Sequence, residues 1–221
     1  MTGVQTCALP ICALDLSAFY FDIRKDSLYC DPLDTSRRRA ARTVLDTLFN
    51  CLTAWLAPIL VFTAEEAWLN RFPSDGDSVH LRLFPEIPAA WRNDALGEKW
   101  RAVRRLRRVV TGALEVERKA KRIGSSLQAD PTVHADADYI GALSGIDLAE
   151  VVITSLATLS EGPPADGAFT LDDVTGVAVV AGLAQGEKCD RCWKLLPEVG
   201  DAGLCERCVQ AVAAPGRPAA G

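Results

Sequence analysis

Four cysteines in the last part of the chain form two pairs with the same spacing, Cys189-x2-Cys192 and Cys205-x2-Cys208. A Cys-x2-Cys pair turns two thiolates toward one side of an ion about 2.3 Å away, as tetrahedral zinc requires. The twelve residues between the pairs are enough to fold the second pair back against the first. The spacing therefore predicts one zinc ion held by these four cysteines.

Two other interpretations of the cysteines are two disulfides or four buried free thiols. Disulfides need an oxidising compartment, and residues 1–12 contain no Lys or Arg for the basic region of a signal peptide. Four thiolates also close the coordination sphere, whereas hydrolytic zinc keeps a position open for water. We therefore expect a structural ion. The cysteine-rich segment is too small to have a core of its own, so its fold should depend on this ion.

No other group of residues predicts catalysis. The two histidines, His80 and His134, are isolated from each other and from acidic or nucleophilic partners. No glycine-rich phosphate loop follows a predicted strand, and no Ser or Cys lies in a nucleophile motif. We predict no catalytic residue in this chain.

Length and composition are those of a soluble protein with one sizeable core and a small appended unit. The chain has 221 residues, of which 49% are hydrophobic and 24% charged. Its longest apolar run, residues 52–62, is interrupted by Pro58 and is far shorter than the roughly 20 residues that cross a bilayer. The net charge of −5 means that any nucleic-acid contact must come from a local basic patch, and we expect no membrane partner.

The two ends of the chain differ from the rest. Residues 1–12 have neither a helix cap nor periodicity, and resemble a translated sequencing-adapter read, so we expect them to be non-native. Patterning begins abruptly at Ala13, which suggests that the natural protein continues upstream. Residues 212–221 are rich in Ala, Pro and Gly, and we expect a disordered tail.

Hydrophobic periodicity predicts three helices in the first half. Apolar residues three and four apart predict an amphipathic helix over 34–57. A second helix over 63–72 opens with the spacing of a capping box, and residues 78–84 read as an extended piece. The third and longest helix covers 95–123, and Gly124 suits the left-handed position that ends it.

The longest helix has a basic face opposite its apolar stripe. At about 100° per residue, the apolar side chains between Val103 and Leu114 lie on one side, and Glu115 is the only acid on the other. A solvated charged surface would explain this face, but it lacks the alternating signs of such surfaces, so binding to nucleic-acid phosphates is an equal alternative. The cations on this face are Arg101, Arg104, Arg105, Arg108, Arg118, Lys119 and Arg122.

After Gly124 the pattern changes to short β-branched runs. Residues 125–134, 150–155 and 174–182 predict strands, and residues 136–148 predict a helix between the first two. These elements together predict a small α+β unit that leads into the cysteine pairs.

Several segments resemble known proteins. Residues 19–31 (FYFDIRKDSLYCD) resemble the start of the anticodon-binding domain of bacterial isoleucyl-tRNA synthetases. The two cysteine pairs look like the terminal zinc ribbon of that family, which the related valyl and leucyl families do not have. The resemblance covers about residues 13–211, and its other segments are 56–60, 62–68, 121–127, 187–193 and 204–209.

The resemblance implies a function for a larger protein. Enzymes of this family are class I ligases that activate isoleucine with ATP, transfer it to tRNA and hydrolyse mischarged valine. The histidine and methionine signatures of their ATP site are missing here, where the only methionine is Met1. We therefore expect a C-terminal fragment that binds neither ATP nor amino acid and belongs to a cytoplasmic, monomeric enzyme with its catalytic body upstream.

The predicted fold class is mainly α, followed by a small α+β unit and a zinc ribbon. We expect a helical anticodon-binding domain over 13–128, the α+β unit over 129–186 and the ribbon over 187–211. Together they would bind the anticodon stem-loop of isoleucine tRNA, whose unpaired bases can be splayed onto side chains. Trp193 is a candidate for stacking or for packing the ribbon, and Lys194 and Arg207 are candidate phosphate contacts.

Two other classes of function stay open from the sequence alone. One is a free-standing zinc-ribbon module that binds nucleic acid, which selectivity for tRNA over duplex DNA would exclude. The other is a protein-interaction scaffold in which the ribbon docks a partner. Nucleic-acid binding that is insensitive to chelation of the metal would favour the scaffold.

Overall fold

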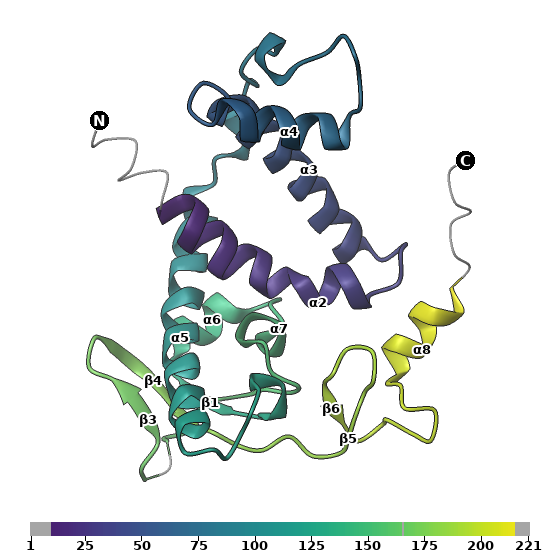
Figure 1. Cartoon of the computed structure of the whole chain (residues 1–221). Coiled ribbons are helices and arrows are strands. Elements are labelled where there is room, and N and C mark those ends of the chain that lie inside the picture. The colour runs from purple at the N-terminus through teal and green to yellow at the C-terminus, as the bar shows by residue number, and fades with distance from the viewer. Residues whose placement is uncertain (1–9, 165, 215–221) are drawn as a thin grey trace. The chain divides into compact units, whose positions relative to one another are not determined.

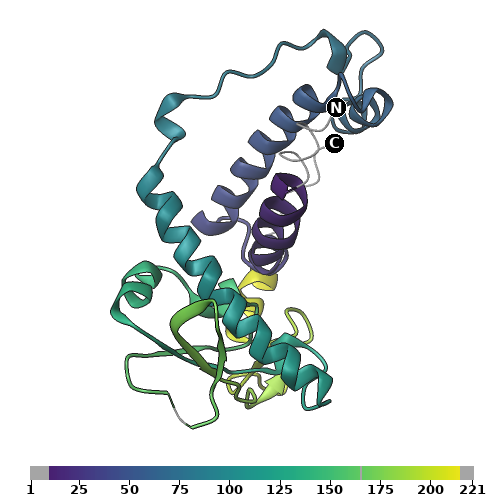
Figure 2. The same cartoon turned by 90° about the vertical axis from the view of Figure 1, so that its left-hand side faces the viewer.

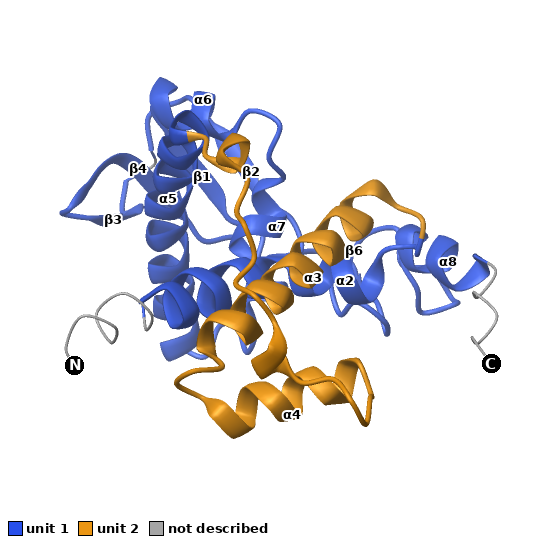
Figure 3. Cartoon of the chain, turned by 90° about the horizontal axis from the view of Figure 1, so that it is seen from above, with its two compact units in different colours: residues 1–33, 94–221 blue, residues 34–93 orange. Residues whose placement is uncertain are grey.

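A computed structural model describes residues 10–164 and 166–214 of the chain (Figure 1). It divides into two compact units, one formed by residues 34–93 and the other by the segments on either side (Figure 3). Residues 1–9 of the expected non-native segment lie outside the described residues, and residues 10–12 begin a helix.

The unit of residues 34–93 is helical. Its small core joins Ala57, Ala64, Trp68 and Val79, with Phe49 packed against them. The guanidinium of Arg82 lies 4.0 Å from the centre of the Trp68 ring, which fixes part of the connection that follows the helices. The helical elements are α3 (Ser36–Leu56), α4 (Val61–Arg71), η2 (Val79–Leu81) and η3 (Ala89–Trp91).

Two details of this unit differ from the sequence prediction. Helix α4 begins at Val61 with Leu60 as its N-cap, so Thr63 lies inside the first turn and forms no capping box. The expected extended piece 78–84 instead contains the 3-10 turn η2. The reason is local hydrogen bonding: the Ser78 hydroxyl accepts from the N–H of His80, and the Glu65 carboxylate accepts from the N–H of Val79.

The other unit combines helices with a four-stranded sheet in the order β2-β1-β4-β3. Strands β1 and β2 run parallel, whereas β4 is antiparallel to both β1 and β3. The helices are η1 (Pro10–Phe21, π-helical), α2 (Asp22–Cys30), α5 (Asp94–Lys119), η4 (Ser126–Gln128), α6 (Ala137–Leu143) and α7 (Leu148–Val152). The strands are β1 (Thr132–Ala135), β2 (Thr158–Ser160), β3 (Phe169–Leu171) and β4 (Val174–Val180).

Helix α5 supplies the centre of this core. Its predicted apolar stripe is confirmed, because Val103, Leu106 and Val110 are fully buried. The stripe packs with Val133 of β1 and Val179 of β4, and α5 runs alongside the sheet in two views (Figures 1 and 2). The expected boundary at 128/129 therefore differs from the structure, in which α5 shares one core with the α+β elements.

The end of α5 is also different from the prediction. The helix ends at Lys119, and Lys121, not Gly124, takes the left-handed conformation with φ 58°. The N–H groups of Lys121 and Arg122 donate to the carbonyls of Arg118 and Glu117, which is the Schellman arrangement. This earlier stop turns Ile123 into the core, where it is 4% exposed.

Residues 136–155 fold mainly as two short helices. Asp136 caps α6, and Gly145 with φ 74° breaks the expected single helix 136–148. The expected strand 150–155 is wrong, because Leu148, Val151 and Val152 are buried at helical spacing in α7. The predicted strand over 174–182 is confirmed as β4, whereas the one over 125–134 contains η4 and begins pairing only at Thr132.

The cysteine-rich segment contains a short hairpin and a helix. Strands β5 (Glu187–Lys188) and β6 (Leu195–Leu196) pair antiparallel, and α8 (Glu206–Ala213) follows the second cysteine pair. Residues 212–213 of the expected tail are therefore helical, and residues 215–221 lie outside the described part. The fold class is confirmed as mainly helical with a small mixed sheet and a terminal cysteine cluster.

Among the described residues, no helix is both long and apolar enough to pass through a bilayer.

Candidate metal centre and the groove beside it

The four paired cysteines meet at one point of the structure. Their Sγ atoms all lie within 4.8 Å of one another, and all four side chains are buried. The Sγ atoms of Cys192 and Cys205 are 3.7 Å apart. A tetrahedron with zinc–sulfur bonds of about 2.3 Å has edges of about 3.8 Å, so the cluster fits zinc. All four are free thiols in the structure, so neither of the two disulfides is present.

Backbone hydrogen bonds shape both cysteine pairs. In the first, the Cys189 N–H donates to the carbonyl of Lys194 at 2.9 Å, and the Trp193 N–H donates to the carbonyl of Cys189 at 2.8 Å. Trp193 adopts φ 67°, which closes this turn. In the second pair, Cys205 is the N-cap of α8. A tight turn in the first pair and a helix start in the second therefore point the four thiols at a common centre.

The thiols differ in acidity. Burial raises the pKa of Cys189, but N–H groups of Cys192, Cys205 and Arg191 outweigh it and bring that pKa down to about 6. The N–H of Cys205, for example, lies 3.3 Å from the Cys189 sulfur. Burial raises the pKa of the other three cysteines, Cys192, Cys205 and Cys208. A divalent cation is the charge that would hold all four as thiolates, and with four sulfur ligands its role is structural.

A groove of about 400 Å³ opens next to the cysteine cluster. Two of its lining residues are aromatic and exposed: Trp193 is 61% exposed and Tyr29 is 75% exposed. Lys188 places its ammonium 5.5 Å from the centre of the Trp193 ring. The lining comes from α2, from the region of α7 and from the first cysteine pair: Asp22, Ile23, Lys25, Asp26, Tyr29, Cys30, Leu127, Ala149, Glu150, Ile153, Thr154, Arg191, Cys192, Trp193 and Lys194.

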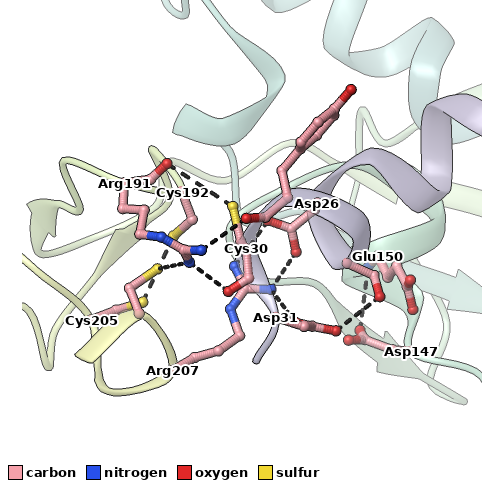
Figure 4. A network of polar contacts seen from close by, with 12 residues as sticks. Asp26, Cys30, Asp31, Asp147, Glu150, Arg191, Cys192, Cys205 and Arg207 are labelled. Carbon is pink, nitrogen blue, oxygen red and sulfur yellow. Dashed lines mark hydrogen bonds and ion pairs between the residues drawn. The ribbon is translucent and has the colours of Figure 1, made fainter. Parts of the chain in front are cut away.

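The groove thus brings together two residues of the sequence prediction, Trp193 and Lys194. Arg207 is placed elsewhere: its guanidinium binds the carboxylates of Asp26 and Asp31 (Figure 4). Sequence reasoning missed Arg191, whose guanidinium reaches α2 from the first cysteine pair. The available signal was the shared pattern Cys-x-Arg-Cys, which puts Arg191 and Arg207 at the same position of the two pairs.

The basic face of α5 is largely paired with acids of the same chain. Arg104 bonds Asp15 of η1, and Arg108 bonds Asp173 at 2.8 Å. Arg105 instead points its Nε at the Tyr139 hydroxyl. Lys119 is exposed. The remaining pairs lie on or next to the helix itself: Arg101 with Glu98, Arg118 with Glu115, and Arg122 with Glu117.

These pairs change the electrostatics of the face. Hydrogen bonding to Arg108 lowers the pKa of Asp173, and hydrogen bonding to Arg122 lowers that of Glu117. Sequence reasoning counted Glu115 as the only acid, whereas Glu98 and Glu117 of α5 also pair with this face and Asp15 and Asp173 reach it from other elements. Most of these side chains are exposed, so solvent screens each pair and its arginine can exchange partners.

Comparison with protein families gives two matches. The model for the anticodon-binding domain of tRNA ligase matches residues 9–133, which is more than half of the chain. The model for a zinc finger found in FPG and IleRS matches residues 186–211, the segment that carries the four cysteines. The second match agrees with a structural zinc site at the cluster.

Curated relatives are similar over most of this chain. The isoleucine–tRNA ligase of Ruegeria pomeroyi is 56% identical over 210 residues, which are 93% of this chain and 22% of the relative. That of Agrobacterium fabrum is 59% identical over 190 residues, 85% of this chain and 19% of the relative. That of Caulobacter vibrioides is 54% identical over 193 residues, which are 87% of this chain and 20% of the relative. The chain spans about a fifth of the length of these relatives.

Proposed function

This chain belongs to the family of anticodon-binding domains of tRNA ligases, and we propose that it is the part of an isoleucine–tRNA ligase that holds the anticodon stem-loop of isoleucine tRNA. The observation that carries the proposal is the groove in which an exposed Trp193 lies between the cysteine cluster and α2. Unpaired bases of an RNA loop bind by stacking on such aromatic faces.

The ribbon provides the stacking surface in this proposal. One zinc ion, held by Cys189, Cys192, Cys205 and Cys208, would fix the turn that carries Trp193. Trp193 stacks on a loop base, and the exposed Tyr29, which also lines the groove, is available for a second base. Lys194, which lines the groove, neutralises a neighbouring phosphate.

The basic face of α5 provides sequence-independent affinity. Its arginines are held by exposed acids, and a phosphate backbone offers a denser array of negative charge than Asp15 and Asp173 do. Arg101, Arg104, Arg105, Arg108, Arg118, Lys119 and Arg122 are the cations proposed for this role. For Arg207 we propose attachment of the ribbon in place of phosphate contact, which its bonds to Asp26 and Asp31 and its low exposure support.

The activity of the whole enzyme would lie outside this chain. We propose that the complete protein is a monomeric, cytoplasmic ligase that uses ATP to attach isoleucine to tRNA and edits mischarged valine. Its catalytic and editing sites would lie in the four fifths of the relatives that this chain does not match. The chain by itself should support neither aminoacylation nor ATP–pyrophosphate exchange.

The test is binding of isoleucine tRNA to the purified zinc-loaded chain, compared with another tRNA and with duplex DNA at the same salt. We expect preference for isoleucine tRNA, and we expect Trp193→Ala to weaken that binding roughly 5- to 100-fold with unchanged zinc content. Trp91→Ala removes an equally exposed indole, 60%, outside the groove and serves as the control. Equal affinity for tRNA and duplex DNA would instead favour a general zinc-ribbon module, and no nucleic-acid binding at all would favour a protein-interaction scaffold.

A further inference from the structure

Both cysteine pairs carry an arginine immediately before their second cysteine, Arg191 in the first and Arg207 in the second. Both guanidinium groups have hydrogen-bond partners within the protein. Both reach the last turn of α2, a helix more than 150 residues earlier in the sequence, as Figure 4 shows. The two pairs therefore present two forks of hydrogen-bond donors to a single helix end.

Arg191 caps the C-terminal end of α2. Its Nη1 donates to the carbonyl of Cys30 at 2.5 Å and its Nη2 to the carbonyl of Tyr29 at 2.8 Å. Carbonyls in the last turn of a helix have no partner within the helix, and the helix dipole favours a cation there. The same Nη1 lies 3.6 Å from the Cys208 sulfur. Arg191 thus joins the metal cluster directly to the helix end.

Arg207 holds the same turn through carboxylates. Its two terminal nitrogens bond the two oxygens of Asp26, with the longer contact at 2.9 Å, and Nη1 also lies 3.2 Å from Asp31. The Asp31 side chain is only 3% exposed and accepts from the buried Ser27 hydroxyl at 2.8 Å. A planar fork that binds two oxygens of one carboxylate sets orientation as well as distance.

Other contacts tie the ribbon to the body at single points, and one of them joins the Cys30 thiol to the carbonyl of Arg191 at 4.0 Å. The Leu195 N–H donates to the Ser155 hydroxyl at 2.7 Å. The apolar cluster around the cysteines is small, and Cys30 is the one member from α2 among its buried described residues. Two arginines with several charge-assisted bonds therefore provide most of the directional contact between ribbon and helix.

We propose that Arg191 and Arg207 are positioning residues that clamp the metal-loaded ribbon onto the end of α2 and so set the shape of the groove. Tyr29, Cys30 and residues 191–194 all line that groove, so the clamp joins two parts of its lining. The metal orients both arginines because each is next to a ligand. The part of this inference that concerns tRNA rests on the proposed function, whereas the clamp itself does not.

The experiment uses Arg207→Gln and Arg191→Gln in the full zinc-loaded chain, with Arg71→Gln as a control that loses one charge from an exposed pair with Asp46. Zinc per chain, amide hydrogen exchange and isoleucine-tRNA affinity are measured for each. We expect zinc near one per chain in all variants. Exchange of amides in 27–31 and 187–196 should accelerate by roughly 10- to 100-fold only in the clamp variants, and tRNA affinity should fall with it.

A second variant, changed on the α2 side of the contact, keeps the clamp testable if an arginine variant does not fold. Asp26→Asn keeps both arginines and weakens the Arg207 contact from the side of α2, so it should reproduce the faster exchange with zinc retained. Combining it with Arg207→Gln should add little, because both changes remove one contact. Unchanged exchange in both single variants, or loss of zinc from either, would overturn the clamp. Absence of tRNA binding by the parent would overturn the proposed function and leave the exchange result to decide the clamp.

Discussion

Arginines in this chain take two different roles according to their burial. Arg107 is mostly covered, with its side chain 18% exposed, and donates to Asp22 and to the carbonyl of Val151 inside the protein. Arg108, one residue later, is 56% exposed and bonds only the exposed Asp173 among its described contacts. A buried guanidinium must keep its partners, whereas an exposed one can exchange an acid for a phosphate. This difference in burial separates arginines that hold the fold together from arginines that are candidates for binding phosphate.

The pairing of Arg108 can be tested through the acidity of its partner. The hydrogen bond lowers the pKa of Asp173, so the pair is fully formed above the ordinary carboxyl pKa of about 4 and is lost as pH falls through the lowered value. Arg108→Gln should raise the pKa of Asp173 toward its ordinary value, measured by NMR titration of the side-chain carboxyl. Arg122→Gln should raise the pKa of Glu117 instead and leave Asp173 as it is. An Asp173 titration that does not respond to Arg108→Gln would show that the pair is not formed in solution.

At the scale of elements, α5 is the helix on which the sheet is built. Its fully buried residues lie three and four apart and face β1 and β4. Gly112 in the same helix lies against Phe169 of β3, where an added Cβ would come within 2.8 Å of the ring. The sequence periodicity predicted the buried face, and the sheet is what buries it.

The packing of α5 predicts the effect of a core truncation. Leu106 is fully buried, so Leu106→Ala should lower the free energy of unfolding of the sheet-containing unit by about 2–5 kcal/mol. The unit of residues 34–93 has its own small core and should keep its hydrogen-exchange protection. Leu83→Ala, at a side chain that is 90% exposed, is the matched control in that unit. Equal loss of protection in both units would contradict the assignment of α5 to the sheet.

At the scale of the whole molecule, metal binding and the packing of the two apolar cores involve different parts of the chain. The cysteine cluster is confined to residues 189–208, whereas the two apolar cores lie elsewhere in the described chain. A segment with so small a core depends on its ligand for folding, and the larger units do not.

Chelation of zinc should therefore loosen only part of the molecule. We expect faster hydrogen exchange over 187–213 and at the end of α2, with the main helical melting transition nearly unchanged. Cys192→Ser should lower zinc below one per chain and reproduce the same local pattern, whereas Cys51→Ser, a buried cysteine of the other unit, should retain the metal. A single cooperative loss of all helix signal on chelation would contradict this division.

The basic face of α5 predicts the salt dependence of tRNA binding. If its arginines contact phosphates, the logarithm of affinity should fall with that of salt at roughly −0.7 to −0.9 per contact. Replacing Arg104 and Arg108 by Gln should flatten the slope by up to about two units and weaken all tRNAs alike. The lost pairs with Asp15 and Asp173 are exposed and screened by solvent, so the melting curve of the double variant should change little. If a salt titration gives the same slope for the double variant as for the parent, the basic face of α5 is a solvated surface that does not contact tRNA.

The sequence alone determined the features that repeat at short range. The spacing of the cysteine pairs predicted the cluster of Cys189, Cys192, Cys205 and Cys208, and the 3.6-residue period predicted the buried stripe of α5. Local patterning misjudged residues 150–155, because β-branched Val151 and Val152 fit a short helix once Asp147 caps it and the core around α5 buries them. Propensity is a weak guide where tertiary packing decides.

Only the tertiary structure decided which arginines are paired with acids from distant parts of the sequence. Asp15 and Asp173 approach the basic face of α5 from other elements, and Asp26 and Asp31 take Arg207 away from the surface. No spacing along the chain relates Arg207 to an acid more than 170 residues earlier. The fold brings them together, because Arg207 precedes a cysteine of the cluster and the end of α2 offers the oxygens that it binds.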